Sequence, residues 1–177
     1  MDQTGNVRYL TIVRHAEATP AASGVTDFDR ALSPRGRVQC NELRAWAEDL
    51  ESLGRYGPTT ALVSAAARTA ETFERAFKGT AFVHRVEFSR TIYNGRRDVS
   101  PEDLLFELVA IDPVTTSLMV VAHNPTVLEL MFELAAELPH SLRKAHYWLA
   151  GAYVVALPDD QPVGARRCEV VASFLPG

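Results

Sequence analysis

The sequence is poor in lysine and cysteine, and it lacks any long hydrophobic run. Of 177 residues only two are lysine, against 16 arginines, and the two cysteines, Cys40 and Cys168, form no Cys-x-x-Cys pattern. The longest apolar runs hold about six residues, well short of the roughly 20 that span a membrane. The first residues also lack the apolar segment of a signal peptide. We therefore expect a soluble cytoplasmic protein with reduced thiols and no membrane partner.

Basic residues are also fewer than acidic ones. The formal net charge is −4, with 18 basic residues against 22 acidic ones, which argues against a nucleic-acid partner. The length predicts a single domain over residues 1–177. Most of the arginine excess is explained by compositional bias, but an arginine can bind an anion with two parallel hydrogen bonds, which lysine cannot.

Strand-like and helix-like segments alternate along the chain. Strands are predicted at Val7–Arg14, Thr59–Val63, Ala81–Val86, Ser117–Ala122, Ala152–Leu157 and Cys168–Phe174, and helices begin at Pro34, Ala65, Pro101 and Pro125. Ser33 and Ser100 are predicted helix caps. This order predicts an α/β fold, a three-layer α/β/α sandwich with a mostly parallel central sheet and an antiparallel C-terminal strand pair.

Polar residues follow three of the predicted strands. They are Arg14-His15, the segment from Ser64 to Arg68, and His123-Asn124. Ligands of parallel sheets bind beyond the carboxyl ends of the strands, so two histidines and two arginines are expected at one edge. Helix N-termini add unpaired N–H groups there, and the whole set predicts an anion site.

A neutral histidine in such a site can accept a phosphoryl group, and the arginines can stabilise the transferring oxygens. No metal ligand motif accompanies these residues, and two arginines would repel a cation. The sequence therefore predicts no metal and no cofactor.

Four segments resemble motifs of the histidine phosphatase superfamily, also called phosphoglycerate mutase-like. They are the Arg14-His15 segment from Leu10 to Glu17, the segment from Asp29 to Gly36, the Ser-x-x-x-Arg-x-x-x-Thr pattern from Ser64 to Thr72, and the segment from Val120 to Pro125 around His123. They stand in the family's order. The short chain is most similar to the small bacterial phosphohistidine phosphatases.

The resemblance implies a role for each matched residue. His15 would accept the phosphoryl group, and Arg14, Arg68 and His123 would complete the phosphate pocket. Ser64 is interpreted either as a substrate-binding hydroxyl or as a residue that starts the following helix. Two positions depart from the family pattern, because Ala16 replaces the usual glycine and Asn124 stands where the acid-phosphatase branch has a proton-donating Asp. An amide cannot donate that proton, so Asn124 is interpreted as a helix cap and a substrate-binding residue.

The proton donor is left open among three carboxyl groups. Glu87 is the first choice because it follows the third predicted strand, Glu17 is second and Asp98 is third. A labile P–N bond needs less acid assistance than an alkyl ester. A missing acid would therefore favour phosphohistidine as substrate.

The function predicted from these residues is a metal-independent phosphatase that acts through a phosphohistidine on His15, on a phosphorylated protein. A phosphatase or mutase for small phosphoesters, a non-catalytic phosphate-binding module and a metallohydrolase are the alternatives. Arg96 and Arg97 are interpreted as a solvated face, or as a contact for an acidic protein or a second phosphate. Asp29 and Arg30 are interpreted as a structural pair.

Overall fold

The computed structural model describes residues 8–52, 56, 59–95, 98–111, 117–144, 146–157 and 168–177. Strands and helices alternate through these residues up to a final pair of strands. The elements are β1 (Arg8–Arg14), α1 (Pro34–Ser52), β2 (Thr59–Ser64), α2 (Ala67–Ala76), β3 (Val83–Ser89), α3 (Pro101–Ile111), β4 (Ser117–Ala122), α4 (Thr126–Leu134), the short 3₁₀ helix η1 (His140–Leu142), β5 (Ala152–Leu157) and β6 (Glu169–Phe174).

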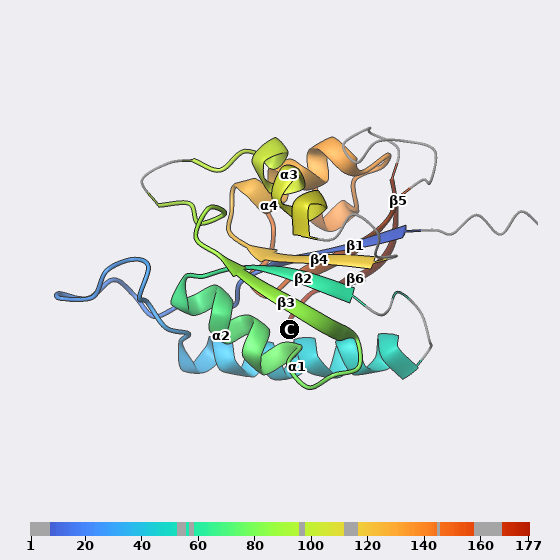
Figure 1. Ribbon diagram of the computed structural model, residues 1–177. Helices are drawn as coiled ribbons and strands as arrows, with labels where there is room; N and C mark the ends of the chain where they lie inside the picture. The colour runs from blue at the N-terminus through green and yellow to red at the C-terminus, as the bar shows by residue number, and fades with distance from the viewer. Residues whose placement is uncertain are drawn as a thin grey trace, which may run out of the picture.

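The six strands form one sheet in the order β3-β2-β4-β1-β5-β6. The pairs β1–β4, β2–β4 and β2–β3 are parallel. Strand β5 runs antiparallel to both of its neighbours, β1 and β6. Helices α3 and α4 cover one face and α1 and α2 the other (Figure 1). The predicted three-layer fold with an antiparallel C-terminal pair is confirmed.

Both faces of the central strands are buried, so each strand contributes to two cores. On β1, Leu10 and Ile12 pack into the core beneath α3 and α4, whereas Val13 packs into the core beneath α1 and α2. Strand β4 divides its residues in the same way, with Val120 on one face and Val121 on the other. A strand covered on both sides is apolar throughout rather than alternating, which explains the continuous apolar runs in the sequence.

Both predicted serine caps are present. Ser33 Oγ accepts a hydrogen bond from the N–H of Gly36 at 3.0 Å at the start of α1. At the start of α3, the N–H of Asp103 donates to Ser100 Oγ and the N–H of Ser100 donates to Asp103 Oδ2, each at 3.1 Å. This reciprocal pair is a capping box, with Asp in place of the usual Glu.

Several boundaries differ from the prediction by one to three residues, among them those of β3 and α4. Strand β3 begins at Val83 and continues to Ser89, so Glu87 lies inside the strand instead of after it. Helix α4 begins at Thr126, one residue after the predicted start, and ends at Leu134, after which Ala135 forms a bridge with Cys168. Val7, predicted as the start of the first strand, lies outside the described residues.

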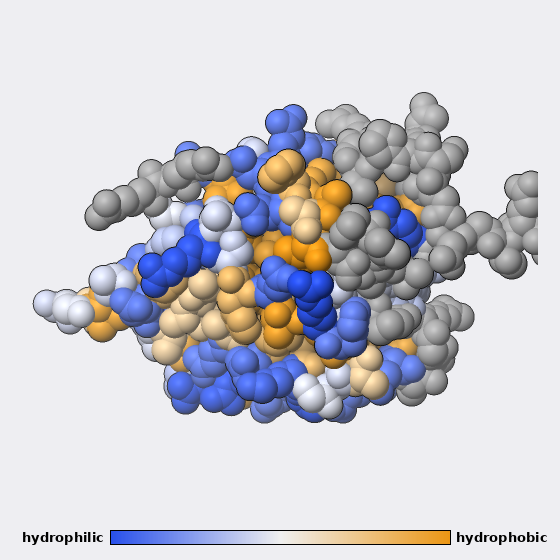
Figure 2. Space-filling view, in the orientation of Figure 1, coloured by the Kyte–Doolittle hydropathy of each residue, from blue (hydrophilic) through white to orange (hydrophobic). Residues whose placement is uncertain are grey.

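Strand β3 is the outer strand of the sheet on the side seen in Figure 1. Figure 2 shows hydrophobic and hydrophilic residues intermixed on this face, and the exposed hydrophobic side chains include Phe88 of β3 and Phe106 of α3. None of the helices in the described part of the chain is long and apolar enough to cross a membrane.

Candidate active site

The ends of β1 and β4 bring the two predicted histidines together. The N–H of His15 donates to the carbonyl of Ala122 at 3.1 Å, which continues the ladder between the two parallel strands. The ring centroids of His15 and His123 are therefore only 5.2 Å apart. They line a cavity of about 350 Å³ together with Arg14, Glu17, Ala18, Arg30, Arg68, Asn94, Asn124 and Leu149. In Figure 1 the segments that follow β1 and β3 extend past this same end of the sheet.

The hydrogen bonds of His15 determine which ring nitrogen faces a substrate. Nδ1 lies 2.7 Å from the carbonyl oxygen of Ala16, and a carbonyl can only accept, so Nδ1 carries the proton. The pKa of His15 is lowered to about 3, chiefly by burial; the charges of Arg68 and Arg14 add to this effect, and the hydrogen bond to the Ala16 carbonyl opposes it. The ring is neutral at pH 7, and its Nε2 lone pair is unprotonated and suited to nucleophilic attack.

Arg68, the second residue of α2, holds the His15 ring in position. Its Nε donates to His15 Nε2 at 3.3 Å. Its Nη1 donates to the carbonyl of Asp27 at 2.6 Å, and its Nη2 pairs with the Asp27 carboxylate at 3.1 Å. The guanidinium is almost fully buried, and the carboxylate supplies the counter-charge that burial requires.

Thr72, four residues after Arg68, links helix α2 to the backbone next to His15. Its hydroxyl donates to the carbonyl of Arg68 at 2.6 Å and accepts from the N–H of Ala16 at 3.0 Å. This one side chain therefore joins the first turns of α2 to the backbone directly after His15. The distance between the nucleophile and the arginine is fixed by a buried link.

His123 is held by a second hydroxyl. Ser64 Oγ, at the end of β2, lies 2.8 Å from His123 Nε2. Burial lowers the pKa of His123 well below its usual range, and the neighbouring His15 and Arg68 lower it further. When the hydroxyl of Ser64 donates this bond, His123 Nδ1 carries the remaining ring proton and can donate it to an anion.

Three buried polar atoms of the cavity-lining residues have no hydrogen-bond partner within the described chain. They are Arg14 Nε, His123 Nδ1 and Asn124 Oδ1. Arg14 is held in place through Nη1, which donates to the carbonyl of Tyr147, so Nε remains free. Unpaired buried polar groups are costly, and their gathering at one cavity indicates a site built for a polar ligand. Two of them can donate to the oxygens of a phosphoryl group.

The first choice for the proton donor does not reach this cavity. Glu87 lies on the outer strand β3 and pairs with Arg85. Asp98 is exposed and does not line the cavity either. Glu17 does line it, and its Oε1 accepts a hydrogen bond from Ser33 Oγ at 2.7 Å. The structure therefore favours Glu17, the second of the three candidates.

Asn124 was expected to cap the helix after β4, and that interpretation is wrong. The residue at the N-cap of α4 is Pro125, and no side chain caps this helix. The Asn124 side chain instead lines the cavity, which agrees with its second predicted role in substrate binding.

Sequence reasoning missed four residues around the site. Arg30 and Asn94 line the cavity, and Arg30 pairs with Asp27 at 2.7 Å instead of forming the expected pair with Asp29. The Tyr93 hydroxyl donates to Asp27 Oδ2 at 2.7 Å, and this bond, together with Arg30 and Arg68, holds the pKa of Asp27 well below its usual range. Their loops are polar and have no periodicity, so no local pattern in the sequence marks these residues as part of a site.

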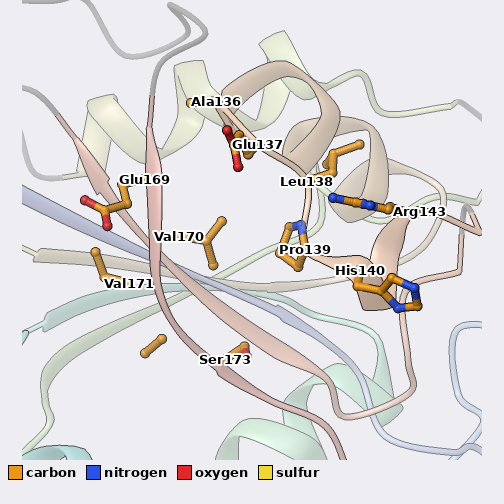
Figure 3. A pocket seen from close by; sticks show the side chains of 11 residues that line it. Ala136, Glu137, Leu138, Pro139, His140, Arg143, Glu169, Val170, Val171 and Ser173 are labelled. Atoms are coloured by element: carbon orange, nitrogen blue, oxygen red, sulfur yellow. The ribbon is translucent and has the colours of Figure 1, made fainter.

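A larger cavity, of about 780 Å³, lies beside the outer strand β6 and the segment that follows α4 (Figure 3). His140 and Arg143 line it, but His15 and His123 do not, so this cavity is not the predicted phosphate site.

In the part of the chain that the structure describes, no cluster of three His, Cys, Asp or Glu side chains is arranged to hold a metal ion. Arg96 and Arg97 lie outside the described residues.

The sheet order, together with two histidines and two arginines at the carboxyl ends of its strands, defines the histidine phosphatase fold. Comparison with solved structures agrees. The chain is similar to a protein of Agrobacterium tumefaciens assigned as the phosphohistidine phosphatase SixA, with 26% identity over 96% of this chain and 99% of that one, at a TM-score of 0.72.

Two further solved structures share this fold. The protein histidine phosphatase SixA in complex with tungstate is 22% identical over 95% of this chain and 97% of that one, with a TM-score of 0.70. A protein of Escherichia coli assigned as an alpha-ribazole-5'-P phosphatase is 14% identical over 97% of this chain and 99% of that one, with a TM-score of 0.63. No protein-family model and no curated protein sequence matches the chain.

Proposed function

We propose that the protein is a metal-independent phosphatase that transfers a phosphoryl group to Nε2 of His15 and then to water, and that its substrates are proteins phosphorylated on histidine. One observation carries this proposal. The Ala16 carbonyl fixes the proton of His15 on Nδ1, which leaves the Nε2 lone pair beside the guanidinium of Arg68.

In the first step the phosphoryl group occupies the cavity between the two histidines. Its oxygens accept hydrogen bonds from the free Nε of Arg14, from Arg68 and from His123 Nδ1. Nε2 of His15 then forms a bond to phosphorus while the bond to the leaving nitrogen breaks, and the electron pair passes to that nitrogen. The fixed positive charges stabilise the transferring oxygens as the bonds change. They do so without a metal ion.

In the second step water attacks the phosphorus and His15 Nε2 regains its lone pair. Glu17 is the carboxylate on the cavity wall, so it is the group that can accept the proton of this water. In the first step the leaving imidazole of a phosphohistidine can depart as a neutral ring when its other nitrogen carries a proton. The departure of this ring therefore needs no strong acid in the protein.

A small phosphoester is the second candidate substrate, and the position of Glu17 favours it. An alkyl oxygen must take up a proton as it leaves, and the Glu17 carboxyl group is the group on the cavity wall that can supply it. The two substrate classes therefore differ in their need for this side chain. A non-catalytic phosphate-binding module would bind the same oxyanions without turnover.

The fold neighbours support this choice of chemistry. One of them carries the name of a phosphohistidine phosphatase, and another is named a protein histidine phosphatase and is complexed with tungstate, a tetrahedral oxyanion. The cytoplasmic location and the single domain expected from the sequence stay predictions.

The test compares three substrates: a protein phosphorylated on histidine, an alkyl phosphate and p-nitrophenyl phosphate. We expect phosphate release without added metal, unaffected by chelator, inhibited by vanadate and fastest from the phosphohistidine protein. His15→Ala should abolish all turnover, whereas His84→Ala, which changes an exposed histidine of β3, should leave it intact. Efficient turnover of the alkyl phosphate with no activity on phosphohistidine would overturn the substrate assignment, and full activity of His15→Ala would overturn the mechanism.

A further inference from the structure

A second cavity adjoins the candidate active site. Its volume is about 640 Å³, and its walls are Thr26, Asp27, Phe28, Arg90, Tyr93, Asn94 and Gly95. Asn94 lines both this cavity and the one that holds His15. The two cavities are therefore neighbours. When the phosphoryl group of a substrate faces His15, a neighbouring group of the same substrate can occupy the second cavity.

A chain of ring contacts connects the two cavities. The His123 ring lies 5.5 Å from the Tyr93 ring, and Tyr93 lies 5.0 Å from Phe28, edge to face in both cases. The guanidinium of Arg90 covers the other end of this chain, with Cζ at 4.9 Å from the centre of the Phe28 ring. This contact favours a defined position for an otherwise exposed arginine.

The two charged residues that line the second cavity, Asp27 and Arg90, differ in their partners. The carboxylate of Asp27 is occupied by Arg30, by Arg68 and by the hydroxyl of Tyr93. Arg90 is different, because its side chain has no ion pair or hydrogen bond to any described residue. One guanidinium on the cavity wall is therefore free to bind an anionic group, and the nearest carboxylate on that wall is already neutralised.

We infer that this cavity, which we call the Arg90 subsite, binds a carboxylate side chain of the protein substrate close to the phosphorylated residue. This inference rests on the proposed function and adds a substrate preference to it. The planar guanidinium over Phe28 can form two parallel hydrogen bonds to a carboxylate. The two cavities share Asn94, so we place the carboxylate within about three positions of the phosphohistidine, a stretch of extended chain that reaches about 10 Å.

The test uses paired phosphohistidine peptides that differ only in Glu against Gln at each of the three positions on either side of the phosphorylated residue. We expect the wild-type protein to prefer the Glu peptide at one or more positions by about fivefold in kcat/KM, mainly through KM, as one partly exposed charged contact provides. Arg90→Ala should remove this preference. Arg90→Lys should keep only part of it.

Two controls separate this inference from the proposed function. Arg85→Ala removes the same charge from an arginine that pairs with Glu87 on β3, and it should retain the preference for Glu. A small phosphoramidate with no flanking group should be hydrolysed equally well by the wild-type protein and by Arg90→Ala.

The outcomes are distinct. Equal turnover of Glu and Gln peptides by the wild-type protein, with His15 still essential, would overturn the Arg90 subsite alone. A preference for Glu that survives in Arg90→Ala would overturn it as well. Failure to hydrolyse any of the peptides or the phosphoramidate would overturn the proposed function on which it rests.

Discussion

The protonation of His15 gives a prediction that can be worked through from the structure. Burial next to Arg68 and Arg14 lowers the pKa of this ring to about 3, from an ordinary value of 6.5. At 1.36 kcal/mol per pKa unit, this shift corresponds to roughly 5 kcal/mol in favour of the neutral ring in the folded protein. We therefore expect His15 to stay neutral, with its proton on Nδ1, at every pH from 8 down to about 4.5.

The assay is a titration followed by NMR of the protein labelled with ¹⁵N in its histidine side chains, with His15→Gln used to assign the signal. The Nδ1-protonated tautomer should persist through the range, because the carbonyl of Ala16 accepts that proton. Arg68→Gln should raise the pKa of His15 only in part, since burial and not Arg68 is the largest cause of the shift. A midpoint near pH 6.5 in the wild-type protein would refute the reasoning.

The same shift has a consequence for stability. Between pH 6.5 and 3 the unfolded chain protonates His15, whereas the folded chain does not, so unfolding takes up protons in this window. The free energy of unfolding should therefore fall as the pH drops below 6.5, by up to about 1.4 kcal/mol per pH unit from this one residue. In His15→Gln this part of the slope should be absent, and urea denaturation at pH 7, 6 and 5 measures the difference. Identical slopes in the two proteins would contradict the low pKa.

Three further substitutions test other parts of the structure. Gly36→Ala should lower the free energy of unfolding by about 2 kcal/mol, because its Cβ would lie 2.1 Å from the carbonyl oxygen of Glu17; an unchanged urea midpoint would contradict this close approach. Thr72→Val should cost about 1–3 kcal/mol and reduce kcat, since it removes the link between α2 and Ala16; full activity would show that the link is dispensable. Glu17→Gln should slow phosphoryl transfer from an alkyl phosphate to His15 by about 100-fold and spare the transfer from phosphohistidine, while it slows the later attack of water for both substrates; equal losses in the transfer step would contradict the assigned role.

The sequence was most informative where hydrophobic runs and caps specify the backbone. The buried stretches of β1 and β4 are apolar except for Thr11 and Ser117, as is typical of parallel strands covered on both faces, and polar residues follow each of them directly. Parallel strands end at one edge, so the approach of His15 to His123 could be predicted without coordinates.

The parts that sequence reasoning missed depend on contacts between loops. The pairing of Asp27 with Arg68 joins residues 41 positions apart, and nothing in the local pattern distinguishes Asp27 from Asp29. Glu87 was placed wrongly for a related reason. Strand β3 is an outer strand with polar residues among its apolar ones and no fully buried position, so the sequence does not define where it ends. The strand ends three residues later than predicted, which places Glu87 inside it.

The most direct test of the central claim is to trap the phosphorylated protein. Brief incubation with a phosphohistidine protein, followed by rapid denaturation at alkaline pH and mass spectrometry of peptides, should place an acid-labile phosphoryl group on His15. The phosphoryl group should be absent from the His15→Ala protein, and it should still be found on His15 in the His84→Ala protein. Hydrolysis that proceeds with no phosphoryl group on His15, or with one on another residue, would contradict the account.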